Sequence, residues 1–226
     1  MKFLPHGAIT ALAIAFFTAS VLSWNDANSQ TKPETSAEVP SETTISDGLN
    51  KPRRHFRVDR AAALDDDAAR DIYNRLQGGM AKGYALSETP AAKNYQSWKR
   101  YNSAPYGSST HGNRFVNNYA NAKAAAYGKY EAAGKLPPGA VIAKDSFMVA
   151  DDGAAAPGPL FIMEKMPEGF SYVSGDWRYT MIMPDGSVFG ATRGANTNRV
   201  EFCIGCHLAQ EKVDHLYFLP EKWRVR

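Results

Sequence analysis

The chain has 226 residues, a length that fits one large domain or two small ones. Its 26 basic and 23 acidic residues give a formal net charge of +3, and no long basic run is interleaved with aromatic residues. This composition argues against proteins that bind nucleic acid through a basic patch, so we expect no nucleic-acid partner.

The first 29 residues have the pattern of an export signal. Lys2 precedes an apolar stretch over residues 8–22, and the small residues Ala27 and Ser29 suit a cleavage site. The apolar stretch is shorter than the roughly 20 residues needed to cross a bilayer. We therefore predict a signal peptide over 1–29 and a periplasmic protein, with an uncleaved N-terminal anchor as the alternative.

Residues 30–57 are rich in Thr, Ser, Glu and Pro and almost free of large apolar side chains. Such a segment cannot bury enough surface to offset the entropy that ordering it would cost. We predict a disordered linker over 30–57. It should be followed by one compact domain over 58–226, which holds nearly all the aromatic residues of the mature chain.

Two helices are expected at the start of this domain. Residues 59–76 repeat apolar side chains at four-residue spacing, with acidic residues suited to the positive end of a helix dipole. The glycine-containing segment 78–84 is expected to end this helix. A second helix should begin at Pro90, after the N-cap Thr89, and run to Tyr101.

Most of the remaining domain has the pattern of short strands separated by turns. Strands are predicted over 114–121, 139–149, 158–166 and, in two runs joined by a turn, 176–190. A third helix is predicted over 122–134, closed by Gly134. Because turns rather than long helices connect the strands, we expect antiparallel pairing. The predicted fold class is α+β, an antiparallel β-sheet with several helices.

The only two cysteines, Cys203 and Cys206, lie three apart, and His207 follows the second directly. A disulfide across so short a loop would stabilise little. A dithiol redox pair is normally found in a thioredoxin-like βαβ unit, and no such pattern surrounds the motif. Tetrahedral zinc would need two further ligands, His207 and one of His55, His111 or His215.

Covalently attached haem accounts for all three residues of the motif at once. Positions three apart share one face of a helical turn, so Cys203 and Cys206 can both bond the vinyl groups of one porphyrin. The imidazole of His207 can then bind the iron. Haem c is matured outside the cytoplasm, in agreement with the export signal. We therefore predict one haem c near the C-terminus.

The position of the motif narrows the class of cytochrome. Only nineteen residues follow His207 and none is methionine. Small electron-transfer cytochromes usually carry the motif near their start and take a methionine ligand from downstream, so the chain does not look like one of them. Four-helix cytochromes of the c-prime type place the motif at the C-terminus, but the predicted strands argue against a bundle.

Six segments carry a further pattern: KNYQSW (93–98), RFVNNYAN (114–121), GKLPPGAVIAKDSF (134–147), GDWRY (175–179), CIGCH (203–207) and KVDHLYFLP (212–220). In this order they resemble the cytochrome P-460 family and its relatives, the beta-type cytochromes c-prime. The resemblance covers roughly 92–220. It implies an antiparallel sheet with helices, usually in a homodimer, and a high-spin haem with one histidine ligand and an open distal face.

The resemblance suggests roles for residues on two predicted strands. Lys144 falls where catalytic members link a lysine amine to the porphyrin edge; a solvated lysine is the alternative. Catalytic members also carry a distal carboxylate on the next strand, for proton transfer. Our alignment puts Phe161 there, as an apolar cap over the iron. Glu164, three residues on, and Asp145 are the candidate acids, although strand alternation turns Glu164 away from Phe161 and Asp145 away from Lys144.

Two functions follow from this resemblance. In the first, the protein oxidises hydroxylamine with Lys144 and Glu164 as catalytic residues, and passes electrons to a redox partner protein. In the second, it binds nitric oxide without turnover, with Phe161 and Phe147 as apolar caps.

A third hypothesis, an electron carrier, would need Met163 or Met181 as a sixth iron ligand. Methionines on strands more often serve packing. His111 and His215 are expected to be surface or hydrogen-bonded residues rather than iron ligands, because nothing in their spacing selects either.

Overall fold

The structure is a computed structural model that describes residues 55–225. The predicted signal peptide over 1–29 lies outside the described residues, as does the predicted linker up to residue 54. Within the described part of the chain, no helix is both long and apolar enough to cross a membrane.

One antiparallel sheet of eight strands organises the described residues. The strands are Lys99–Arg100 (β1), Tyr106–Ser108 (β2), Arg114–Ala120 (β3), Val141–Val149 (β4), Ala155–Pro157 (β5), Leu160–Lys165 (β6), Trp177–Ile182 (β7) and Val188–Ala191 (β8). Their order is β1-β3-β4-β6-β7-β8, with β2 also paired to β3 and β5 to β4. The α+β class is confirmed, and β3, β4, β6, β7 and β8 lie where strands were predicted.

The helix α2 spans Asp66–Tyr84, so it begins and ends later than predicted. Asp65 caps its start with a side-chain hydrogen bond to the backbone. The helix continues through the glycines that were expected to end it, because Met80 and Tyr84 beyond them are buried against the sheet. This burial outweighs the helix-weakening effect of each glycine, about 1 kcal/mol.

The other helices are shorter. They are α3 (Pro90–Asn94), α4 (Glu201–His207) and the 3₁₀ segments η1 (Tyr95–Ser97), η2 (Ala122–Ala132), η3 (Tyr172–Ser174), η4 (Thr197–Val200), η5 (Leu208–Val213) and η6 (Glu221–Trp223). The helix α3 begins at Pro90 as predicted but ends early, because η1 turns the chain into β1. The helix predicted over 122–134 is the 3₁₀ segment η2.

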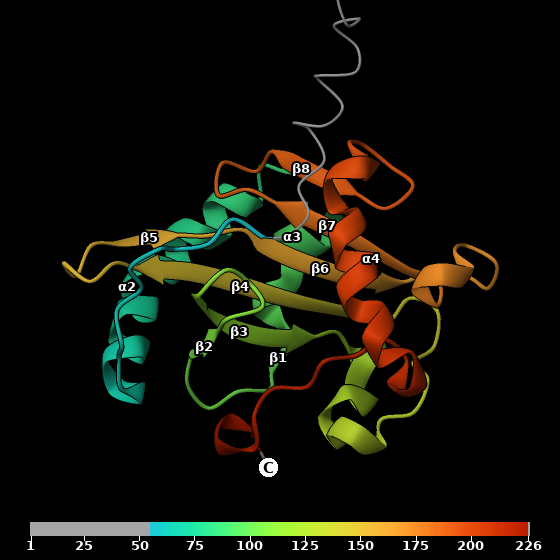
Figure 1. Ribbon diagram of the computed structural model, residues 1–226, viewed down its shortest axis with the longest axis horizontal. Coiled ribbons are helices and arrows are strands. Elements are labelled where there is room, and N and C mark those ends of the chain that lie inside the picture. Colours follow the sequence, from blue (N-terminus) through green and yellow to red (C-terminus); the bar gives the residue numbers. More distant parts are fainter. Residues whose placement is uncertain (1–54, 226) are drawn as a thin grey trace, which may run out of the picture. The chain divides into compact units, whose positions relative to one another are not determined.

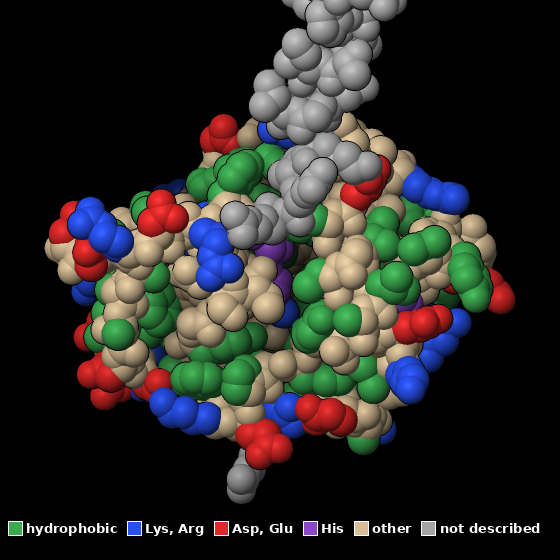
Figure 2. Space-filling view, viewed as in Figure 1, with side chains coloured by type: hydrophobic (Ala, Val, Ile, Leu, Met, Phe, Trp, Pro, Cys, Tyr) green, Lys and Arg blue, Asp and Glu red, His purple; other side chains and the backbone are tan. Residues whose placement is uncertain are grey.

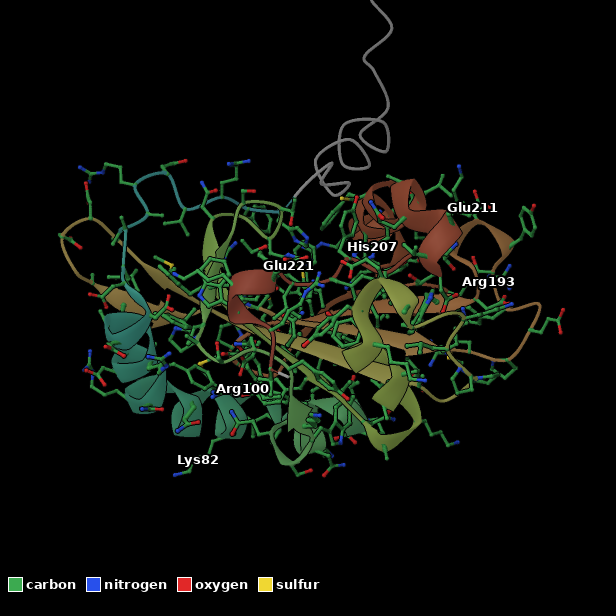
Figure 3. The ribbon with its side chains drawn as sticks, turned by 90° about the horizontal axis from the view of Figure 1, so that it is seen from below. Lys82, Arg100, Arg193, His207, Glu211 and Glu221 are labelled. Carbon is green, nitrogen blue, oxygen red and sulfur yellow. The ribbon has the colours of Figure 1, made fainter. Side chains whose placement is uncertain are left out.

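The sheet separates two layers. We call the side packed by α2 and α3 the helix face; its core includes Phe147 and Leu160. We call the opposite side the cavity face; its core includes Met163 and Trp177, and α4 crosses in front of β6 and β7 there (Figure 1). Figure 3 shows the same division from below, with the α4 end on one side of the sheet and α2 on the other. Because side chains alternate along a strand, sequence neighbours serve opposite faces.

Asp145 is fully buried on the helix face among hydrogen-bonding side chains. Its carboxylate accepts hydrogen bonds from the Tyr73 hydroxyl at 2.6 Å, the Tyr95 hydroxyl at 3.1 Å and the Asn117 amide at 3.0 Å. The Tyr73 hydroxyl also lies 2.6 Å from that of Tyr119. Burial nevertheless raises the pKa of Asp145 to about 6.

An Asp145→Asn variant should lose one component of the pH dependence of stability. From its ordinary value of 3.8 the pKa rises to about 6 on folding, so in this window the folded chain binds a proton that the unfolded chain has released. The contribution of Asp145 to the unfolding free energy is present at low pH and is lost as pH rises through about 6. The difference in unfolding free energy between wild type and variant should change by about 3 kcal/mol between acid and neutral pH.

Urea unfolding of both proteins at a series of pH values measures this difference. Histidines that titrate in the same pH window do so in both proteins, so their effect cancels in the difference between the two unfolding free energies. A difference that stays constant with pH would contradict the assignment.

Candidate functional site

A cavity of about 200 Å³ lies on the cavity face. Strands β4, β6 and β7 form its floor, α4 forms one wall, and His55 with the segment 110–111 lies at its rim. Figure 2 shows histidine side chains in a recess near the middle of this face. Most of the lining is apolar. The cavity therefore has the character of a site for a largely apolar group with a few polar anchors.

The helix α4 brings both thiols and an imidazole to this cavity. Cys203, Cys206 and His207 all line it, and the helical turn predicted for the motif is confirmed. Both cysteines are free, and burial raises the pKa of the Cys203 thiol to about 12. The zinc alternative requires several His, Cys, Asp or Glu side chains grouped around one point. Among residues 55–225, no three such side chains are arranged to hold a metal ion.

His207 is held in one tautomer by a backbone group. Its Nδ1 lies 2.7 Å from the carbonyl oxygen of His215. Because a carbonyl only accepts hydrogen bonds, Nδ1 carries the proton, and the lone pair of Nε2 is free to bind a metal. Burial lowers the pKa of His207 to about 4, so the ring is neutral at neutral pH. The sequence prediction missed this role of His215 because a backbone carbonyl leaves no residue pattern.

A buried ion pair anchors the loop that presents this carbonyl. Lys165, on β6, pairs with Asp214 and donates a hydrogen bond to the Gly175 carbonyl at 2.8 Å. Asp214 also accepts a hydrogen bond from the Leu136 amide at 2.9 Å. Asp214 and His215 both have positive φ, 57° and 60°, which side-chain-bearing residues adopt at a cost. The ion pair therefore helps to hold a strained loop against His207.

A Lys165→Met variant should be strongly destabilised, because it leaves the carboxylate of Asp214 buried without its cation. The expected loss is about 3–5 kcal/mol in unfolding free energy, measured by urea denaturation. Arg178→Met is the matched control, since Arg178 forms a partly exposed pair with Glu164 on the same sheet at 3.5 Å. That control should cost less than about 1 kcal/mol. Equal losses in the two variants would contradict the anchoring role.

The structure brings Lys144 to the cavity but not Glu164. Lys144 on β4 lies directly across from Phe161 on β6, and both side chains line the cavity. Glu164 is three residues beyond Phe161, so it faces away, where its carboxylate pairs with Arg178. The prediction of Glu164 as a distal acid is therefore corrected. No Asp or Glu of the described chain lines this cavity.

The side chain of Lys144 is buried, and its amine makes no hydrogen bond or ion pair with residues 55–225. Burial lowers its pKa to about 8, against an opposing effect of the nearby Cys206. A lysine with this pKa holds an appreciable neutral fraction near neutral pH, and the neutral amine is the nucleophilic form. The solvated lysine considered as the alternative is thus excluded.

Two neighbours of Lys144 on β4 serve the helix face. Asp145 points away from the cavity, as predicted. Phe147, predicted as a second apolar cap, instead stacks on Phe115 with ring centroids 5.4 Å apart and lies against Tyr73. The prediction for Phe147 was wrong, because a residue three positions from Lys144 must face the other side of the strand.

Two histidines at the rim were not predicted as functional residues. The rings of His55 and His111 stack with centroids 5.2 Å apart, and both contact the ring of Phe161. His111 is buried and hydrogen-bonded, with Nδ1 2.9 Å from Ser108 Oγ. We expected His111 to be either a surface residue or a hydrogen-bonded one. It is hydrogen-bonded, but it does not lie on the surface. No motif contains either histidine, so the sequence carried no signal for their meeting.

The segment 55–58 reaches the cavity because it docks on the turn before β3. Arg114 donates a hydrogen bond to the Phe56 carbonyl at 2.5 Å. Gly112 has a φ of +79°, and a Cβ added there would lie only 2.2 Å from the same carbonyl oxygen. Glycine therefore permits both the backbone conformation and the close approach. This docking sets His55 at the cavity rim.

The residues that line the cavity fit a covalently attached haem. Two thiols one helical turn apart and the free Nε2 of His207 meet the needs of thioether attachment and a single histidine ligand. Two buried polar atoms of the lining, Nδ1 of His55 and the hydroxyl of Tyr179, have no hydrogen-bond partner in the described chain. Such atoms normally have partners, so they point to a bound group.

Comparison with known proteins agrees with the assignment of a haem site to this cavity. The family model described as Cytochrome P460 matches residues 92–218, from α3 to the segment that follows His207. No curated protein matches the chain. Membership of this family implies a haem cofactor, and the motif makes it haem c. Because the matched range covers more than half of the chain and confirms the resemblance found in the sequence, the chain belongs to the cytochrome P460 family.

Proposed function

We propose that the protein is exported to the periplasm and oxidises hydroxylamine at a single haem c. The haem is attached through Cys203 and Cys206 and ligated by His207, and electrons pass to a redox partner protein. Bound haem supplies an exchangeable iron site for the substrate nitrogen and accepts electrons one at a time. The members that the chain resembles also imply a homodimer.

The position of Lys144 carries this proposal. Its buried side chain lines the same cavity as both thiols, and the lowered pKa of the amine leaves part of it uncharged. In the proposed enzyme this amine is bonded to the porphyrin edge, as in the catalytic members that the chain resembles, and tunes the electronics of the ring. The distal acid proposed from the sequence, Glu164, has no part in this account.

Phe161 favours a second candidate function, the binding of nitric oxide without turnover. Its ring lies in the cavity against His55 and His111, with centroid distances of 4.8 and 4.9 Å. An apolar cap of this kind suits a small neutral gas. An electron carrier is the weaker alternative: Met163 and Met181 both line the cavity, and either would have to serve as a sixth ligand.

Turnover with hydroxylamine and an artificial electron acceptor tests the proposal. Protein matured in the periplasm is expected to reduce the acceptor and to show a red-shifted ferrous Soret band. Tight nitric oxide binding with an ordinary high-spin spectrum and no turnover would favour the second function instead. A low-spin spectrum would favour the electron carrier.

A further inference from the structure

The proposed oxidation releases protons next to a buried iron site. Two molecules of hydroxylamine give one nitrous oxide, one water, four protons and four electrons, and the external acceptor takes the electrons. Some group on the cavity wall must take up the protons and pass them to solvent. Within residues 55–225 no carboxylate lines the cavity, and the proposed function commits Lys144 to the porphyrin.

His111 links the cavity to the protein surface. Its imidazole lines the cavity and is only 8% exposed. Nδ1 lies 2.9 Å from Ser108 Oγ and 3.3 Å from Thr110 Oγ1, and the two hydroxyls are 3.3 Å apart. Ser108 is half-buried and Thr110 is exposed. These three side chains thus form an unbroken chain of hydrogen-bonding groups from the cavity to solvent.

The chemistry of this chain suits proton transfer. A hydroxyl can both donate and accept, so Ser108 accommodates either neutral tautomer of His111. The other ring nitrogen, Nε2, makes no hydrogen bond within the described residues and is left for a group in the cavity. A proton taken at Nε2 can therefore be matched by one released from Nδ1 to Ser108.

Two further features keep His111 in place and uncharged. Its ring stacks on His55 and contacts Phe161, which fixes the plane of the imidazole. Burial holds the pKa of His111 well below its usual value. A proton that arrives at this ring is passed on rather than retained.

We propose that His111, Ser108 and Thr110 form the proton exit of the cavity. His111 takes protons from bound hydroxylamine, and the two hydroxyls carry them to solvent. This inference rests on the proposed oxidation of hydroxylamine, and it assigns the proton-transfer role to an imidazole on the loop between β2 and β3.

Steady-state turnover of the holoprotein with hydroxylamine and ferricyanide provides the first test. His111→Gln keeps a polar side chain but lacks an imidazole, which can accept a proton at one nitrogen and release one from the other. In this variant kcat should fall about 100-fold with little change in KM. A Ser108→Ala, Thr110→Val double variant keeps the imidazole and should also lower kcat. The matched control is Ser109→Ala, because Ser109 is exposed on the same loop and bonds neither His111 nor its partners.

Haem content and thermal unfolding of each variant identify losses that come from misfolding. If the wild type turns over and His111→Gln keeps its kcat, the proton exit is overturned. If the double variant keeps its kcat while His111→Gln does not, the path through the hydroxyls is overturned.

A second readout does not depend on turnover, so it separates a failure of this inference from a failure of the proposed function. The infrared N–O stretch of the nitric oxide adduct should shift in His111→Leu, because Nε2 no longer hydrogen-bonds the ligand, and should stay unchanged in Ser109→Ala. An unshifted band in His111→Leu would overturn the contact between His111 and the ligand, even in a protein that does not oxidise hydroxylamine.

Discussion

A Cys203→Ser, Cys206→Ser double variant is expected to carry no covalently attached haem. Thioether bonds require sulfur, and these are the only two cysteines of the chain. Intact-mass analysis of protein exported by a host that matures haem c should find the mass of one haem on the wild type and none on the variant. Each single variant retains one thiol and can form at most one thioether bond.

Ile204→Ala is the matched control, because Ile204 lies between the two thiols on α4 and its replacement keeps both sulfurs. This control should retain the attached haem. A haem mass on the double variant would contradict the assignment, as would a zinc ion in place of haem on the wild type.

Lys144→Ala is expected to return the ferrous Soret band to the position of ordinary haem c and to reduce hydroxylamine turnover below detection. Both effects would follow from the loss of the proposed bond between the amine and the porphyrin edge, which changes the electronics of the ring. The visible spectrum and the acceptor assay of periplasm-matured protein measure them.

Two further variants sharpen this test. Lys144→Arg keeps a cation in the cavity, but the guanidinium stays charged and cannot act as the amine does, so it should behave like Lys144→Ala. Lys129→Ala removes an exposed lysine and should match the wild type. If the visible spectrum of Lys144→Ala is the same as that of the wild type, the proposed cross-link between Lys144 and the porphyrin is wrong.

The longer strands could be predicted from the sequence because local patterns and turns specify them. The end of α2 could not, because it depends on the burial of Met80 and Tyr84 against a sheet formed by distant residues. The short strands β1, β2 and β5 were also missed, since two or three residues give no readable alternation.

In the candidate site, too, features set by neighbouring residues in the sequence could be predicted, whereas features set by contacts between distant residues could not. The CxxCH motif is contained in one helical turn, and its geometry followed from spacing alone. Lys144 and Phe161 followed from the family resemblance, and strand alternation explains why Phe147 and Glu164 do not join them. His55 could not be foreseen, because its approach depends on the backbone contact at Gly112.

The alternation along β4 has a consequence for how this protein can be altered. Lys144 serves the cavity, and the adjoining Asp145 serves the tyrosine cluster behind the sheet. Inserting or deleting one residue between Val141 and Lys144 would move each side chain to the opposite face, which places a carboxylate in the cavity and an ammonium group among the tyrosine hydroxyls. Substitutions on one face of β4 therefore leave the side chains of the other face in place, whereas a one-residue shift in register would disturb both layers together.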